Sequence, residues 1–459
     1  LDATEEQLDF PLLYAVGRDG IAQKKLDVNN KNLHVLFDTI LEEIPGPLHD
    51  SSQPFQLLVS DLGYSDYLGR LAIGKIKNGS PRFSDQLICI NEKGNYLSLK
   101  ISSLQTYQGL GVVSKDSASP GDIIVLAGIE DVMIGDTICT REAPKALKRI
   151  RVEEPTVSML FTINTSPFAG KEGKYVQSSK IQERLYKETL SNVAIKVEES
   201  ENKESFTVKG RGEFQMAILI ETMRREGFEL CVGRPKVILK TINGKKCEPM
   251  EHLFVDCDED FLGVVTEKLS IRKGKMVNVV NNGSGRVRIE FSIPSRGLIG
   301  YRDEFLTDTK GTGLLNSYFS GYEDFRGEFH SRYTGSLVSD RAGMAVAYAL
   351  FNLEARGKLF VKPGDPIYEG MITGEHNRDT DLNVNPCREK KLSNMRAAGK
   401  DDAVILSPIP PMTLEAALNF IRDDEMVEVT PESIRLRKVA LGAKDRYTKR
   451  RLKKKEKRA

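Results

Sequence analysis

Two short stretches of the sequence resemble phosphate-binding patterns, and each is incomplete. Gly69-Arg-Leu-Ala-Ile-Gly74-Lys75 has the glycine and lysine spacing of a P-loop. A P-loop also needs Ser or Thr after the lysine to bind Mg²⁺, and Ile76 stands there instead. The segment alternates like a β-strand and is followed by the turn signal Asn78-Gly79 rather than by a helix. The sequence therefore favours a strand over a nucleotide site at residues 69–75. The second stretch, Asp340-Arg-Ala-Gly343, fits a DxxG pattern, but so short a pattern recurs by chance.

Other catalytic and metal-binding patterns are missing from the sequence. It contains no NKxD guanine-reading motif, no HExxH and no recognisable Ser–His–Asp set. The five histidines and six cysteines show no CxxC pair and no zinc-ligand spacing. On its own sequence, the chain has no identifiable covalent chemistry, no metal site and no bound cofactor. Reduced thiols are typical of a cytoplasmic protein.

Glycine-spaced basic loops are the best remaining candidates for a functional site. Lys171 and Lys174 lie among glycines in the stretch that follows Ser166, and Arg211 stands between Gly210 and Gly212. Glycines let a backbone come close to phosphate, and lysine and arginine supply the charge. Turn glycines with solvated charges remain the alternative interpretation.

A longer basic segment, Gly374 to Lys400, has almost no apolar periodicity and is predicted to be a loop. Loops of that length are uncommon unless they are functional or disordered. Cations can bind RNA phosphate, while amides can contact bases and 2′-hydroxyls. The segment contains the cations Arg378, Arg388, Lys390, Lys391, Arg396 and Lys400 and the amides Asn377, Asn383, Asn385 and Asn394.

Composition indicates a multi-domain protein with an uneven charge. The 459 residues carry a net charge of only +2, yet ten Lys or Arg against two acids crowd the stretch from Lys444 to Arg458. Such a tail is typical of a segment that meets a polyanion, although a solvated tail is the alternative. No run of 18 apolar residues indicates a membrane span. The chain begins with Leu1 in mid-pattern, so we expect it to be a piece of a longer protein.

Periodicity predicts a multi-domain α+β protein with two βαββαβ modules. In the second module, Val287, Ile289 and Phe291 alternate along a strand that Pro294 stops. A helix is then expected from Ser295 past Phe305. The predicted divisions are a last βα unit at 1–47, a small β-barrel at 52–143, ferredoxin-like modules at 154–235 and 236–322, a mixed, strand-rich domain at 323–443 and a basic tail at 444–459.

Several exact stretches of the sequence carry a family resemblance. They are Glu154-Pro-Thr-Val-Ser-Met159, Asn164-Thr-Ser-Pro-Phe168, Gly170-Lys-Glu-Gly-Lys174, Gly210-Arg-Gly-Glu213, Met223-Arg-Arg-Glu-Gly-Phe-Glu-Leu230, Arg234-Pro-Lys-Val237, Ile293-Pro-Ser-Arg-Gly-Leu-Ile-Gly300, Gly311-Thr-Gly-Leu-Leu315 and Asn394-Met-Arg-Ala397. Together they resemble the TypA/BipA family of ribosome-binding translational GTPases, relatives of elongation factor G and LepA. The resemblance covers essentially the whole chain apart from the basic tail.

The resemblance implies the end of a GTPase domain, an EF-Tu domain 2-like β-barrel, ferredoxin-like domains III and V, and a C-terminal domain specific to the family. GTP and Mg²⁺ would belong to the intact family protein, upstream of Leu1, and this chain should not hydrolyse GTP alone. Tyr14-Ala15 stands where the family has a guanine-contacting Ser-Ala pair. The long loop, His376 to Asn394, would reach the peptidyl-transferase centre and the acceptor arm of A-site tRNA.

Two interpretations of the whole chain therefore stay open. In the first, it is the ribosome- and tRNA-binding body of a TypA/BipA-type GTPase, acting in stress adaptation, translation regulation and large-subunit assembly. It would be a cytoplasmic monomer that contacts rRNA of both subunits and no membrane. In the second, it is a non-enzymatic RNA-binding or ribosome assembly factor without a GTPase domain. A third, an enzyme complete in this chain, depends on residues 69–75 alone.

Overall fold

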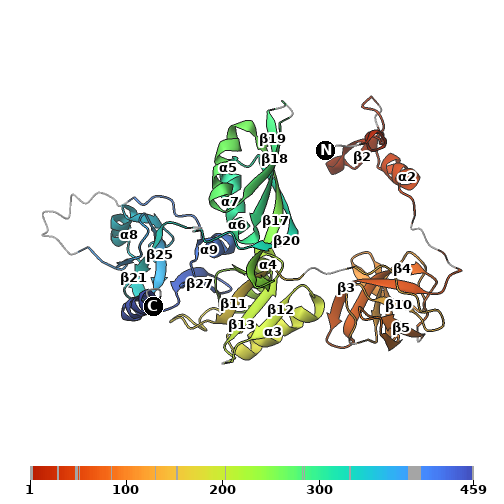
Figure 1. Ribbon diagram of the computed structural model, residues 1–459, viewed down its shortest axis with the longest axis horizontal. Coiled ribbons are helices and arrows are strands. Elements are labelled where there is room, and N and C mark those ends of the chain that lie inside the picture. The colour runs from red at the N-terminus through yellow and green to blue at the C-terminus, as the bar shows by residue number, and fades with distance from the viewer. Residues whose placement is uncertain are drawn as a thin grey trace. The chain divides into compact units, whose positions relative to one another are not determined.

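The computed structural model describes most of the chain and divides it into two units, residues 1–151 and 152–459. The described residues are 4–27, 30–46, 50, 52–83, 85–129, 131–150, 154–201, 203–281, 283, 285–329, 332–390 and 405–456. Within them the protein is mixed α+β and rich in strands, as the sequence predicted (Figure 1). In this described part, no helix has both the length and the apolar character needed to cross a bilayer.

The first unit begins with a short hairpin and a helix. Its elements are α1 (Glu5–Leu8), β1 (Tyr14–Val16), a 3₁₀ turn (Gly17–Asp19), β2 (Ile21–Gln23) and α2 (His34–Glu43). β1 and β2 are antiparallel, with Tyr14 opposite Gln23. Tyr14, at the place where the family resemblance puts a guanine contact, is 37% exposed in this hairpin.

An antiparallel sheet of eight strands makes up the rest of the first unit. The strands are β3 (Gln56–Ser65), β4 (Gly69–Asn78), β5 (Gln86–Ile90), β6 (Tyr96–Lys100), β7 (Ser103–Gln108), β8 (Gly111–Ser114), β9 (Ile123–Ala127) and β10 (Thr137–Thr140). Their order is β6-β5-β10-β3-β4-β9-β7-β8. Among the described residues the end strands β6 and β8 do not pair with each other, so the predicted barrel is not closed by strand pairing.

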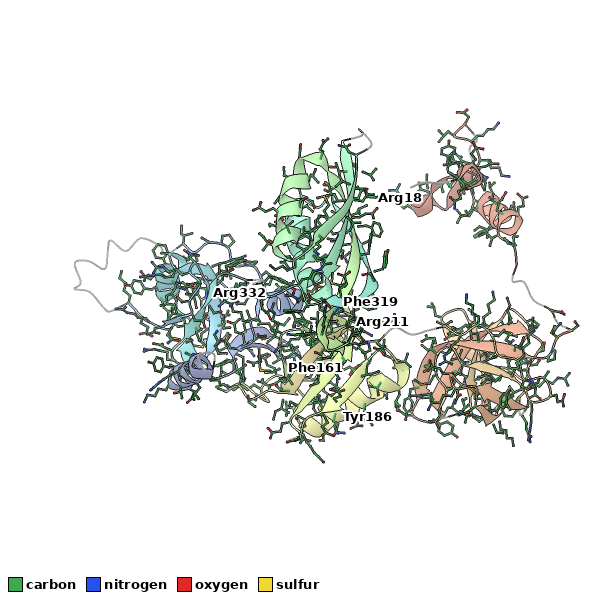
Figure 2. The ribbon with its side chains drawn as sticks, viewed as in Figure 1. Arg18, Phe161, Tyr186, Arg211, Phe319 and Arg332 are labelled. Carbon is green, nitrogen blue, oxygen red and sulfur yellow. The ribbon has the colours of Figure 1, made fainter. Side chains whose placement is uncertain are left out.

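The second unit starts with an alternation of strands and helices. Its first elements are β11 (Val157–Ile163), α3 (Ser178–Ser191), β12 (Lys196–Glu199), β13 (Ser205–Gly210), α4 (Glu213–Arg225), β14 (Leu230–Val232) and β15 (Lys236–Val237). The main strands lie in the order β12-β13-β11-β14, all antiparallel. Apolar side chains of α3 and α4, such as Ile181 and Met216, are fully buried against this sheet, as is Phe161 of β11 (Figure 2).

A second alternation of the same kind follows. It comprises β16 (Lys240–Ile242), β17 (Lys245–Asp258), a 3₁₀ turn (Glu259–Phe261), α5 (Leu262–Ile271), β18 (Lys275–Asn281), β19 (Arg286–Pro294), α6 (Ser295–Leu298), α7 (Tyr301–Asp308) and β20 (Leu314–Asp324). The order is β20-β17-β19-β18, with α5 and α7 over one face (Figure 1). The single helix expected after Pro294 is interrupted, because Gly300 adopts a φ of +71°.

The C-terminal part extends the first of these sheets instead of forming a separate one. Its elements are β21 (Gly335–Ser339), β22 (Gly343–Met344), α8 (Ala347–Glu354), β23 (Gly357–Leu359), β24 (Pro366–Ile367), β25 (Met371–His376), β26 (Leu382–Val384), α9 (Leu414–Phe420), β27 (Glu425–Val429), β28 (Ile434–Lys438) and α10 (Ala443–Glu456). β27 pairs with β14, with Leu230 opposite Val429, so one sheet continues through both regions.

Because of this continuous sheet, part of the segment 374–400, which was predicted to be a loop, forms β-strands. Gly374, Glu375 and His376 belong to β25, and residues 382–384 pair with β21 in parallel as β26. A Cβ on Gly374 would lie 2.5 Å from the carbonyl oxygen of Lys358, so close strand packing explains this glycine. Within the described residues 374–390, the segments outside strands are a turn at 377–381 and the stretch 385–390.

We expect the β14–β27 seam to carry much of the stability of the second unit. Leu230 of β14 is fully buried at this seam, whereas Leu160 of β11 is 43% exposed. Leu230→Ala should cost about 2–5 kcal/mol and lower the urea midpoint of this unit. Leu160→Ala is the matched control and should change the midpoint little. Equal effects of the two substitutions would show that the seam is not where the sheet gains its stability.

Candidate nucleic-acid interface

The segment that resembles a P-loop is a strand in the middle of a sheet. Residues 69–78 form β4, paired with β3 on one side and β9 on the other. Ile76 is 1% exposed, and a Cβ on Gly74 would lie 2.2 Å from the carbonyl oxygen of Leu58. Gly74 therefore serves backbone packing, and a strand paired on both sides does not fit a nucleotide here. Among the described residues no three His, Cys, Asp or Glu side chains are grouped as metal ligands.

The first basic loop, residues 164–174, is held in place by a buried carboxylate. We call this segment the clamped loop. Glu229 is fully buried, and its Oε1 accepts hydrogen bonds from Asn164 Nδ2 at 2.6 Å and from the Gly170 amide at 3.0 Å. Its Oε2 accepts from the Gly173 amide at 3.0 Å. A Cβ on Gly173 would lie 2.4 Å from Glu229 Cβ, so glycine is required for this close approach.

A second carboxylate ties the clamped loop to the C-terminal part of the chain. Glu428 of β27 is fully buried and accepts from Asn164 Nδ2 at 3.2 Å and from Ser166 Oγ at 3.0 Å. Arg435 Nη1 and the Tyr368 hydroxyl also donate to it, at 3.1 and 2.5 Å. Burial and the charge of Glu428 raise the pKa of Tyr368 well above its usual value, so the hydroxyl stays protonated and donates.

Glu172 completes the attachment at the far end of the loop. Its carboxylate accepts hydrogen bonds from Thr430, Ser433 and Arg435. Burial alone would raise the pKa of Glu172, but the bonds from Thr430 and Arg435 outweigh burial and lower it. Glu172, the one acidic residue of the clamped loop, is therefore paired with Arg435 within the protein.

The two lysines of the clamped loop are exposed. Lys171 Nζ lies 4.5 Å from the centre of the Phe168 ring, and Lys174 Nζ lies 5.2 Å from that of Tyr175. Phe168 itself is fixed by an edge contact with Tyr368, with ring centres 5.1 Å apart. The loop thus presents positive charge outward from a backbone that buried acids hold still, as the RNA-binding prediction requires.

Arg211, the third predicted cation, lies at the turn between β13 and α4 (Figure 2). It is exposed, and its backbone is fixed at both ends. The Arg211 amide donates to Gln215 Oε1 at 2.9 Å, and its carbonyl accepts from Thr156 Oγ1 at 2.7 Å. Glu213 follows at the start of α4 and accepts from the Gly300 amide at 3.3 Å. Burial raises the pKa of Glu213 to about 7.

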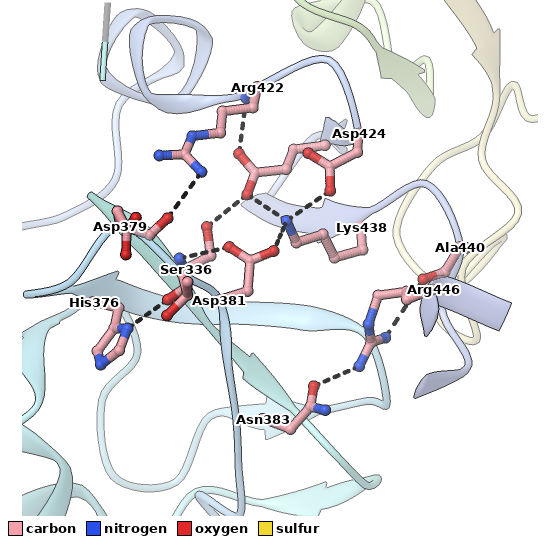
Figure 3. Close-up of polar contacts among 12 residues, drawn as sticks. Ser336, His376, Asp379, Asp381, Asn383, Arg422, Asp424, Lys438, Ala440 and Arg446 are labelled. Carbon is pink, nitrogen blue, oxygen red and sulfur yellow. Dashed lines mark hydrogen bonds and ion pairs between the residues drawn. The ribbon is translucent and has the colours of Figure 1, made fainter. Parts of the chain in front are cut away.

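A buried lysine organises the turn at 377–381 (Figure 3). Lys438 is 1% exposed, and its Nζ lies 2.6 Å from Asp381, 3.0 Å from Asp424 and 2.9 Å from Glu425. Burial would lower the pKa of Lys438, but the three carboxylates outweigh burial and raise it. Burial would raise the pKa of Glu425, but Lys438 and Arg332 outweigh burial and lower it. Asp381 is thereby fixed at the base of the turn.

The predicted loop residues therefore have different environments. His376 is buried, and its Nδ1 donates to the carbonyl oxygen of Thr380 at 2.6 Å, so its contribution is to shape the turn. Asn377 and Arg378 are exposed in the turn, and Arg388 and Lys390 are exposed beyond β26. Lys391, Asn394, Arg396 and Lys400 lie outside the described residues.

The sequence analysis missed the buried charges that position these cations: Glu229, Glu428 and Lys438. A buried ion is recognised by its partners, and these come from segments far apart in the chain. Three cations within four residues, Arg435, Arg437 and Lys438, were the available signal in the sequence.

Comparisons with known proteins agree with the sequence resemblance. Residues 334–443 match the TypA/BipA C-terminal domain, and residues 245–333 match the elongation factor G C-terminus. A protein of Escherichia coli K12 named large ribosomal subunit assembly factor BipA is 49% identical over 97% of this chain and 74% of its own. Proteins of that name from Haemophilus influenzae and Synechocystis are 47% and 45% identical, over 97% and 96% of this chain and 73% and 74% of their own.

Removing the carboxylate of Glu229 should loosen the clamped loop. Glu229→Gln replaces one acceptor oxygen by an amide that faces N–H donors, at a cost of about 1–3 kcal/mol. Hydrogen exchange of the peptide that covers residues 164–174 should become about tenfold to a hundredfold faster. Glu226→Gln, at a partly exposed glutamate paired with Arg184, is the control. Unchanged exchange in Glu229→Gln would mean that the loop is fixed by other contacts.

Glu213 should give the second unit a pH-dependent stability. A carboxyl whose pKa is raised from 4.5 to about 7 on folding favours the folded state while protonated. Its contribution is fully present below pH 4.5 and decreases as pH rises through 7. Glu213→Gln, which keeps the acceptor for Gly300, should therefore raise the urea midpoint relative to the native chain at pH 8. The two midpoints should converge near pH 4.5, and a constant difference across this range would contradict the assignment.

Proposed function

Because the chain belongs to the TypA/BipA family, we propose that it is the ribosome-binding body of a translational GTPase of this family. Its role would be in assembly of the large ribosomal subunit, in translation regulation and in stress adaptation. The relatives that share 45–49% identity with it carry the name large ribosomal subunit assembly factor. The observation that carries the proposal is the clamped loop: buried Glu229 holds its backbone, its one acid Glu172 is paired with Arg435, and Lys171 and Lys174 are exposed.

Such an arrangement suits RNA phosphate for a physical reason. A lysine on a flexible backbone loses conformational freedom when it binds RNA phosphate, and this loss weakens binding. A lysine on a fixed backbone loses less freedom. Gly170 has open space where a side chain would lie, so a phosphate can approach the backbone closely there. Arg211, Asn377, Arg378, Arg388 and Lys390 would add exposed cationic and amide contacts, and Lys391, Asn394, Arg396 and Lys400 would extend them. We propose rRNA of both subunits and the acceptor arm of A-site tRNA as the partners of these residues.

The proposed division into domains follows the resemblance. Residues 1–47 would end a GTPase domain, and 52–143, whose sheet is not closed by strand pairing, would correspond to domain 2 of EF-Tu. Residues 154–235 and 236–322 would be ferredoxin-like domains III and V. Residues 323–443 would be the family-specific domain. The strand orders β14-β11-β13-β12 and β20-β17-β19-β18 support the two ferredoxin-like assignments, because both describe a βαββαβ module. The protein would act as a cytoplasmic monomer without a membrane contact.

Nucleotide chemistry is not assigned to any described residue. GTP and Mg²⁺ would serve the intact family protein by driving a hydrolysis-dependent switch. Residues 69–75 do not fit this role, since they are a paired strand in which Gly74 is in tight backbone contact. What this chain would contribute is binding and orientation of RNA.

Loss of the two loop lysines should weaken ribosome binding. Lys171→Ala/Lys174→Ala should reduce the affinity for purified 70S ribosomes about tenfold, and the slope of log affinity against log salt should become shallower by about 2. Lys180→Ala/Lys187→Ala, on α3 of the same module, removes the same charge and should have little effect. The measurement is co-sedimentation over a range of salt concentrations. Equal behaviour of the two variants would reject the clamped loop as an RNA contact, and failure of the native chain to co-sediment would reject the proposed function.

A further inference from the structure

Helix α10 is the most basic element of the chain, and its first turn is fixed to the C-terminal part. The stretch from Lys444 to Arg458 contains ten Lys or Arg and two acids, and the helix extends from Ala443 to Glu456. Glu369 Oε1 accepts the Ala443 amide at 3.1 Å, which places a carboxylate at the positive end of the helix. The basic segment therefore leaves the body of the protein as a helix in a defined position.

Arg446 forms the second attachment (Figure 3). Its guanidinium donates to the carbonyl oxygens of Ala440 and Leu441 just before the helix and to Asn383 Oδ1, at 2.7 Å, on β26. The segment just before the helix also packs closely on the C-terminal part, because a Cβ on Gly370 would lie 2.6 Å from Leu441 Cα. A guanidinium can bind these three acceptors at once because its donors diverge in a planar fork.

These contacts place α10 beside the turn at 377–381. Asn383 follows the turn directly on β26, and Asp381 at the base of the turn pairs with Lys438, five residues before α10. The Arg378 carbonyl in the same turn accepts the Gly335 amide at 2.5 Å. The basic helix and the exposed turn thus share one rigid base.

We propose that α10 is a phosphate-binding helix that contacts the backbone of a structured RNA next to the turn, with Arg446 and Asn383 as positioning residues. This inference rests on the proposed function and adds a second RNA contact to it. The helix is about 21 Å long, which is enough to follow several phosphates of an RNA strand. Because Asn383 carries no charge, its role is separable from that of the cations.

The composition of α10 favours RNA over a membrane surface. A helix that lies on a bilayer needs a continuous apolar face. From Lys444 to Glu456 the only large apolar side chains are Tyr447 and Leu452, five residues apart and 71% and 54% exposed. Two such residues on a helix this cationic make no apolar stripe, whereas the charge is complementary to a polyanion.

The charge of the helix should appear in the salt dependence of binding. Replacing Lys449, Arg450, Lys453 and Lys454 by Ala should make the slope of log ribosome affinity against log salt shallower by about 3–4, between about 50 and 200 mM salt. Affinity at the low end of that range should decrease at least about tenfold. A slope and an affinity equal to those of the native chain would overturn the proposal. The proposal would also be overturned if this four-residue variant lost binding to phosphatidylserine vesicles while it kept full ribosome affinity.

The positioning role is tested by a substitution that leaves every cation in place. Asn383→Ala should reduce ribosome affinity about threefold to tenfold while the salt slope stays within about 1 of the native value. Arg446→Lys keeps the charge without the planar fork and should behave like Asn383→Ala. Asn352→Ala, at an exposed amide on α8, is the control. Native affinity in both Asn383→Ala and Arg446→Lys would remove the positioning role.

A short RNA duplex separates failure of this inference from failure of the proposed function. If the native chain does not bind ribosomes, the proposed function is wrong, and the helix is judged on the duplex alone. A shallower salt slope of the four-residue variant on the duplex then supports the helix, and equal slopes overturn it.

Discussion

The second unit depends on one strand pairing that joins segments about two hundred residues apart in the chain. β27 pairs with β14, so the sheet that begins at β12 continues into the C-terminal part. On one face of this seam the apolar side chains of α3, α4 and α9 form a single core with Val427 and Val429. On the other face Glu428 accepts four hydrogen bonds from three segments of the chain. The pairing thus fixes both the core and the loop that presents Lys171 and Lys174.

The buried charges near this seam are costly to bury and therefore have to be matched. An isolated buried carboxylate would lose several kcal/mol of solvation, so its partners must be provided by the fold. Glu229 meets amide donors, Glu428 meets Arg435, and Lys438 meets three acids. Each of these ions has partners from distant segments, so it holds those segments in one register. The cations needed at the surface are left exposed because their acidic neighbours are engaged inside.

Much of the secondary structure could be predicted from the sequence, because the patterns that indicate it involve neighbouring residues. The strand that was expected to stop at Pro294 ends there, and the elements of both alternations follow the predicted βαββαβ order along the chain. The joining of two predicted domains into one sheet was not predictable, because Leu230 and Val429 look like ordinary strand residues in isolation. His376 was predicted in a loop for the same reason. Its neighbour Gly374 reads as a loop glycine, whereas strand contact with Lys358 is what requires it.

The candidate site, like the fold, could be predicted only where the signal lies in neighbouring residues. Lys171, Lys174 and Arg211 could be selected from the sequence because glycine spacing and charge are local. Glu229 and Glu428 could not, although they decide whether those cations are presented by a rigid or a flexible backbone. A net charge of only +2 then ceases to argue against RNA binding. What an RNA backbone meets is the charge left exposed after the acids have been paired inside, and on the clamped loop that remainder is positive.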